Sequence, residues 1–187
     1  MLGELPKKLN INGTDWTIRS DFRAVLTIFQ AMNDAELDDA EKITVMLECL
    51  YKNFLSMKKE DYEEAMKKAL WFINGGKDEQ ISKNKEKKIL DWEQDEQIIF
   101  SAVNKVAGKE TRGCSYIHWW TFLGYFSEIG EGLLATIINI RNKRNNGKKL
   151  EDYEQEFYKK NKALIDFEEK YTEEEQQEIE RIKKLFF

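Results

Sequence analysis

The sequence contains little proline, cysteine or histidine, and each shortage excludes a class of protein. Pro6 is the only proline among 187 residues, which suits a chain built from helices, because helix interiors exclude proline. Cys49 and Cys114 supply neither a disulfide framework nor the paired spacing of a metal site. We therefore expect reduced thiols, with Cys49 buried in an apolar helical run, and a cytoplasmic protein with no metal or other cofactor.

Long hydrophobic runs and an excess of positive charge are missing as well. No apolar stretch approaches the roughly 18 residues that indicate a membrane span. Residues 1–6 lack the basic-then-apolar order of a signal peptide. The net charge is -5, so no overall attraction to nucleic acid exists. Neither a membrane nor a nucleic acid is an expected partner.

Charge of both signs is what the chain has in abundance. Charged residues make up 35% of it and hydrophobic residues 41%, against about 25% and 45–50% in ordinary globular proteins. This combination is typical of a helical protein with a charged exterior. At 187 residues the chain is still long enough to bury a core.

Residues 7–19 predict a β-hairpin ahead of the helices. Apolar and polar residues alternate on both sides of Asn12-Gly13, a pair that favours a tight two-residue turn. Because an isolated hairpin is only marginally stable, we expect its apolar face to lie on the helices as a small lid. The alternative is an open strand edge that pairs with another subunit.

Apolar residues at helical spacing predict a mainly α fold, a bundle of about six to seven helices behind the hairpin. The first helix should be capped by Ser20 or Asp21, the second should begin near Asp38, and the third should end at Gly75-Gly76. Their predicted apolar faces are Phe22, Val25, Leu26 and Phe29, then Ile43, Leu47, Leu50 and Phe54, then Tyr62, Met66, Ala69 and Ile73.

Two polar stretches divide the chain. Residues 77–88 contain a single apolar side chain, which cannot offset the entropy cost of ordering them. We predict that they form a mobile loop inside one helical domain, residues 1–147. Residues 148–187 are highly charged and predict a helical C-terminal extension that orders against a partner instead of adding to the core.

The segment 115–126 holds six aromatic rings in twelve residues. So many rings are not left in water, so the segment should form a core or a docking face. We predict a central helix of the second half, between a helix through Ile98 and Val106 and a helix that begins at Leu133. Its predicted buried stripe consists of Tyr116, Trp119, Leu123 and Phe126.

Candidates for chemistry are few. His118 is the only histidine, which excludes a pair of histidine metal ligands, and we favour a ring satisfied by hydrogen bonds over a catalytic base. The carboxylates of Asp91, Glu93, Asp95 and Glu96 could form half of a metal or acid–base site. We favour helix capping for them, because carboxylates at a helix start accept backbone hydrogen bonds. A further alternative is a capping carboxylate that also forms a hydrogen bond with His118 or with the indole N–H of a tryptophan.

Five cationic side chains lie between Arg141 and Lys149. Such a group could hold phosphates, but the C-terminal end of a helix also favours lysine and arginine. We favour a solvated helix end, or ion pairs between molecules, over a nucleic-acid site.

Two motifs of the second half carry a resemblance to a known family. The acidic-tryptophan box Asp91-Trp92-Glu93-Gln94-Asp95 is followed by the helix of Ile117-His118-Trp119-Trp120-Thr121-Phe122. This pattern resembles the gene-product-fifteen proteins of Gram-positive siphophages and prophages, over residues 5–165 of this chain. The signature residues are Asp91, Trp92, Asp95, His118, Trp119, Trp120 and Phe122, and the resemblance implies a structural role that is shared with partner binding.

The resemblance also implies a function. Proteins of this family look like tail-assembly chaperones, so we expect a non-enzymatic protein that binds the tape-measure protein or tail proteins in the host cytoplasm and self-associates. The family has no known catalytic residues, and none is transferred. The alternative is a structural virion or tail-completion protein that is retained in the particle. A third hypothesis is a nucleic-acid-associated regulator that uses the basic residues 141–149.

Overall fold

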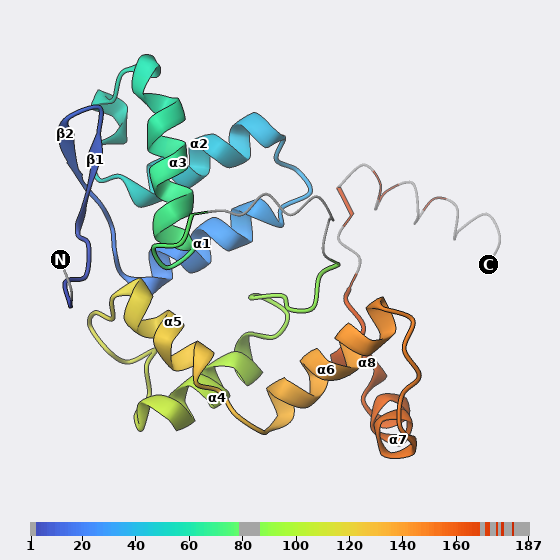
Figure 1. Ribbon diagram of the computed structural model, residues 1–187. Helices are drawn as coiled ribbons and strands as arrows, with labels where there is room; N and C mark the ends of the chain where they lie inside the picture. Colours follow the sequence, from blue (N-terminus) through green and yellow to red (C-terminus); the bar gives the residue numbers. More distant parts are fainter. Residues whose placement is uncertain are drawn as a thin grey trace.

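The computed structural model describes residues 3–78 and 87–168, together with residues 171, 172, 175, 177 and 181. Within these residues the fold is mainly helical, with eight helices and an N-terminal two-stranded hairpin (Figure 1). The predicted fold class is therefore confirmed. The central part of the predicted mobile loop, residues 79–86, lies outside the described residues.

The elements follow one another along the chain with short connections. The strands are β1 (Lys8–Ile11) and β2 (Thr14–Thr17). The helices are α1 (Phe22–Met32), α2 (Asp39–Leu50), α3 (Tyr62–Ile73), α4 (Glu96–Ala107), α5 (Trp119–Ser127), α6 (Leu133–Asn145), α7 (Asp152–Lys160) and α8 (Lys162–Ile165). Two short 3-10 turns, η1 (Phe54–Ser56) and η2 (Lys59–Asp61), join α2 to α3.

The hairpin forms where its turn residues predict it. Asn12 and Gly13 both have positive φ, 46° and 85°, which a two-residue hairpin turn requires. The buried side chains of Leu9 and Ile11 lie on one face of β1, which packs against α3. The hairpin is thus a lid on the helices, as predicted. Beyond β2 the chain pairs with the segment that follows α2, so part of the outer edge is covered.

Helices α1 and α2 begin at the predicted caps. The Asp21 carboxylate accepts a hydrogen bond from the N–H of Arg23, and Asp38 forms a reciprocal capping box with Glu41. The predicted face of the second helix is wrong at one end, because Ile43 is 39% exposed. At the other end α2 stops at Leu50, and the buried Phe54 belongs to η1.

The aromatic helix α5 is shorter than predicted. It begins at Trp119, because His118 is extended (φ -61°, ψ 140°) and pairs with Asp21 in an isolated β-bridge. Tyr116 therefore lies ahead of the helix and is 45% exposed, so its place in the predicted buried stripe is wrong. Trp119 is 1% exposed, as predicted, and Leu123 is half-buried.

Most buried side chains form one core between the hairpin and helices α1 to α5. A second, small cluster contains Ile137, Ile140 and Ile165, and it joins α6 to α8. The C-terminal part of the chain therefore packs on the protein itself as far as Ile165, and the prediction that this stretch would not add to the core is wrong. The predicted burial of Cys49 is also wrong, since the side chain is half-buried. Among the described helices, none is long and apolar enough to cross a membrane.

Candidate functional site

The start of α5 is bonded directly to the start of α1. One Asp21 oxygen caps α1, and the other accepts a hydrogen bond of 3.0 Å from the N–H of Ile117. The backbone adds two more bonds, from Phe22 N to Ile117 O and from Trp119 N to Ser20 O, at 3.0 and 2.8 Å. These bonds hold together two segments that are almost 100 residues apart in sequence, and they fix where the aromatic helix begins.

His118 caps α5 with its imidazole ring. The ring Nδ1 accepts a hydrogen bond of 3.0 Å from the N–H of Trp120, so this nitrogen carries no proton. The other nitrogen, Nε2, then bears the hydrogen and donates it to the carbonyl of Pro6 at 2.9 Å. Burial lowers the pKa of His118 and the charge of Lys7 lowers it further, whereas the bond to Pro6 opposes the shift. The neutral ring thus links α5 to the segment before the hairpin, and the prediction of a satisfied ring is confirmed.

Trp119 and Trp120 bind the C-terminal end of α3. The carbonyls of a last helical turn have no partner within the helix. Here the indole N–H of Trp119 donates to Ile73 O, and that of Trp120 donates to Phe72 O, both at 2.8 Å. The contact is so close that a Cβ at Gly76 would lie 2.8 Å from the Trp120 ring.

The other aromatic members of the signature lie in the core. Phe122 is fully buried and stacks on Phe22, with ring centroids 4.5 Å apart and an interplanar angle of 3°. Trp92 stacks on Phe29 at 5.5 Å and meets the Trp119 ring edge-on at 6.1 Å. Stacked and edge-on pairs are the favoured arrangements of aromatic rings, so α1, α5 and the segment before α4 share one aromatic cluster.

Asp91 shapes the turn that leads into α4. Its carboxylate accepts backbone hydrogen bonds from Glu93 and Gln94, at 2.8 and 3.0 Å, and an ion pair of 2.5 Å from Lys88. Burial by itself would raise the pKa of Asp91, but the hydrogen bonds from Lys88 and the backbone outweigh it and lower the pKa. The predicted bonds to backbone N–H groups are present at this residue, but they lie in the turn before α4 and not at the helix start.

Asp95 has a different role from the predicted one. It precedes α4 without capping it, and its two oxygens bind the guanidinium of Arg141 in α6, at 2.5 and 3.0 Å. Both side chains are buried, and Arg141 also donates to the carbonyls of Ile89, Leu164 and Ile165. All five N–H groups of the guanidinium therefore donate a hydrogen bond. The His118 ring and the indoles of Trp119 and Trp120 bond to backbone groups, so neither Asp91 nor Asp95 forms the predicted bond to them.

Two residues of the basic run beyond Arg141 form ion pairs within the chain. Lys143 donates two bonds of 2.8 Å to the buried Glu154, and Arg144 pairs with Asp166. The side-chain hydrogen bond from Lys143 outweighs burial and lowers the pKa of Glu154. Glu154 lies in α7 and Asp166 directly follows α8, so these ion pairs form within the chain and not between molecules. The expectation of a solvated helix end is confirmed for Arg144, Lys148 and Lys149, which are exposed.

All seven signature residues thus lie in the interior or at internal helix joints. Trp92 and Trp120 are half-buried, and the other five are buried. The structure brings Trp92, Trp119 and Phe122 together, whereas Asp91 lies in the turn before α4 and Asp95 at the joint between α4 and α6. Sequence reasoning missed the partner of Asp95. The available signal was the position of Arg141, one residue after the apolar Ile140 and one turn after Ile137.

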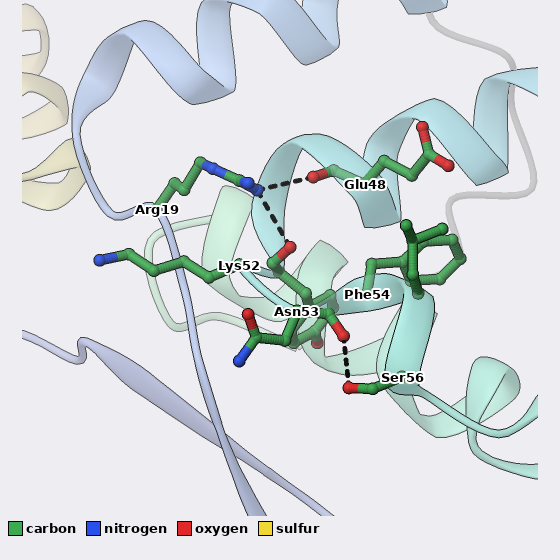
Figure 2. Close-up of a pocket in the computed structure, with 8 residues that line it drawn as sticks. Arg19, Glu48, Lys52, Asn53, Phe54 and Ser56 are labelled. Carbon is green, nitrogen blue, oxygen red and sulfur yellow. Dashed lines mark hydrogen bonds between the residues drawn. The ribbon is translucent and has the colours of Figure 1, made fainter.

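Among the residues that the structure describes, two of the surface hollows have volumes of about 650 Å³ or more and could receive another molecule. The first, of about 650 Å³, lies at the end of α2 and is bordered by Leu55, which is 92% exposed. Figure 2 shows the Arg19 side chain pointing to the end of α2 near Glu48. Its guanidinium donates hydrogen bonds of 2.7 and 3.0 Å to Glu48 O and Tyr51 O. Arg19 therefore caps the C-terminal end of α2, and its guanidinium is bonded to backbone carbonyls.

The second hollow is a groove of about 760 Å³ between α4 and the connection from α5 to α6. Ile98, Ala102 and Val106 lie one turn apart along the α4 wall, and Ile129 and Leu133 belong to the opposite wall. Val106 and Leu133 are 37% and 47% exposed. This groove, which we call the α4–α6 groove, is the larger of the two, and it is lined mainly by apolar side chains. It is our candidate partner-binding site, and sequence reasoning did not single it out.

Comparison with known proteins supplies the identity of the chain. The family model described as Bacteriophage Gp15 protein matches residues 1–167. Neither the curated proteins nor the solved structures gave a match. The matched part includes both signature motifs and ends one residue before the end of the described stretch 87–168. The chain therefore belongs to the Bacteriophage Gp15 protein family.

Proposed function

We propose that this protein is a non-enzymatic factor of phage tail assembly that binds the tape-measure protein or another tail protein while the tail forms. The observation that carries the proposal is family membership over residues 1–167. On this proposal the protein works in the host cytoplasm by holding another polypeptide, and it also self-associates.

The arrangement of the signature residues supports a scaffold role. The His118 ring and both indole N–H groups of α5 are bonded to backbone groups, and Asp95 is bonded to Arg141. Side chains that are bonded in this way fix the positions of the helices relative to one another. A surface that could receive a partner is the α4–α6 groove, and apolar grooves are a common means of recognising another protein.

Co-expression with the tape-measure protein of the same phage tests the proposal. A tag on this protein should recover the tape-measure protein in a stoichiometric complex. The control is an unrelated acidic helical protein with the same tag, which should recover none. The proposed function would be ruled out if the tag recovered no tail protein, neither the tape-measure protein nor the tail-tube protein nor any other.

Purified virions separate a transient factor from a retained one. A protein that acts only during assembly should be absent from mature particles by mass spectrometry, although it is abundant in infected cells. A stoichiometric signal in the virion would favour the alternative, a structural or tail-completion protein.

A further inference from the structure

We propose that the α4–α6 groove is the docking site for an amphipathic helix of the partner, with lysine or arginine along one side of its apolar stripe. The inference rests on the function proposed above and adds the surface and the chemistry of its occupant. The hollow near Leu55 is smaller, and the Arg19 guanidinium on its border is bonded to the end of α2.

The apolar part of the groove matches the length of two helical turns. Ile98 and Val106 lie eight residues apart on α4, which corresponds to about 12 Å along the axis. A partner helix laid along this wall would present apolar side chains at positions i, i+3 or i+4, and i+7. Val106 and Leu133 are partly exposed on the two walls, so they would lose the most water on docking.

The helical α4 wall favours a helix as the occupant. The backbone N–H and C=O groups of α4 are bonded along the helix itself, so this wall offers no edge to which an extended peptide could add as a strand. Recognition must then come from side-chain packing, which is the way that amphipathic helices bind grooves.

Charge at the rim selects the partner. Glu128 and Glu131 lie on the connection between α5 and α6, and Lys105 lies on the α4 side. All three are exposed, and none forms an ion pair with any residue that the structure describes. Two acidic groups along one wall complement a helix with basic residues on that side. A second copy of this chain fits less well, since its net charge is -5.

The test uses the full chain and overlapping peptides of the tape-measure protein, each about 25 residues long so that it can form several helical turns. Binding is measured by fluorescence polarisation. Peptides with an apolar stripe and basic residues beside it should bind, and others should not. Val106→Asp and Leu133→Asp should each weaken binding about tenfold or more, because each places a charge in the apolar contact. Both positions are partly exposed, so circular dichroism should show unchanged folding.

Two further variants provide the controls. Leu55→Asp changes an apolar residue that is even more exposed, but lies outside the groove, and it should bind as the wild type does. The double variant Glu128→Lys and Glu131→Lys should weaken binding several-fold at low salt, and the difference should disappear at high salt because exposed charges are screened.

The outcomes separate this inference from the proposed function. If a tail protein binds and the groove variants bind it equally well, the docking site is wrong while the function stands. If the groove variants only break self-association, the occupant is a second copy, and the inference is also overturned. If no tail protein binds the wild type, the proposed function itself fails.

Discussion

The carboxylate of Asp95 and the guanidinium of Arg141 form a two-bond ion pair that is buried between α4 and α6. The two N–O distances are 2.5 and 3.0 Å, and the side chains are 0% and 3% exposed. The same guanidinium bonds to the carbonyls of Leu164 and Ile165 in α8. A single side chain therefore holds three helices, including one from the charged C-terminal region.

Removal of one partner of this pair should be strongly destabilising. Asp95→Ala leaves the buried Arg141 without its counter-charge, and we expect a loss of about 3–5 kcal/mol in the free energy of unfolding. The double variant Asp95→Leu and Arg141→Met removes both charges and should recover a large part of the loss. Urea denaturation measures both values. Equal stability of Asp95→Ala and the wild type would contradict the role assigned to the pair.

Trp119→Ala should cost about 3–5 kcal/mol of unfolding free energy, because it removes a large buried ring and leaves a cavity. It also removes the indole donor from Ile73 O. Trp120→Ala is the matched control on the next residue, with a half-buried ring, and it should cost less. If Trp119→Ala keeps full stability but abolishes assembly, the ring serves an interface instead of the core.

The free energy of unfolding should decrease as the pH falls below the ordinary pKa of histidine. Because the pKa of His118 is lowered in the folded state, the unfolded chain takes up a proton before the folded one does. The stabilisation is therefore complete above pH 6.5, the ordinary value, and is lost as the pH falls below it. The slope should approach about 1.4 kcal/mol per pH unit at most.

Denaturation of His118→Asn checks this prediction between about pH 7.5 and pH 5.5. Asparagine can still cap the helix with its side-chain oxygen, but it does not titrate. The variant should lose less stability over this interval than the wild type. An identical loss in both proteins would show that other groups cause the pH dependence.

Truncation should separate the two parts of the C-terminal region. A chain that ends at Gly147 loses the Ile165 side chain, the carbonyls bonded to Arg141 and the Glu154 carboxylate, so we expect a loss of about 3 kcal/mol or more. A chain that ends at Glu168 keeps all of these contacts and should unfold near the wild-type temperature. Calorimetry compares the two. Equal melting temperatures would show that α7 and α8 contribute little to the stability of the rest.

Local signals explain the elements that were predicted correctly. Asn12-Gly13 specifies its turn through positive φ, and the carboxylates of Asp21 and Asp38 bond to backbone groups two or three residues away. Interactions over so few residues depend little on the rest of the fold. The start of α5 could not be predicted in this way, because it depends on the bonds between Asp21 and Ile117.

The sequence by itself determined the class of fold, the hairpin, the first caps and the family, since each depends on residue type and short spacing. Only the tertiary structure decided which charges are buried in pairs, which rings face the core and where an apolar groove remains open. Arg141 and Lys143 look alike as a basic run, yet one is buried against Asp95 and the other bonds Glu154. The reason is physical: a buried ion pair and a groove are made by groups from distant segments, and no local pattern records which distant groups will meet.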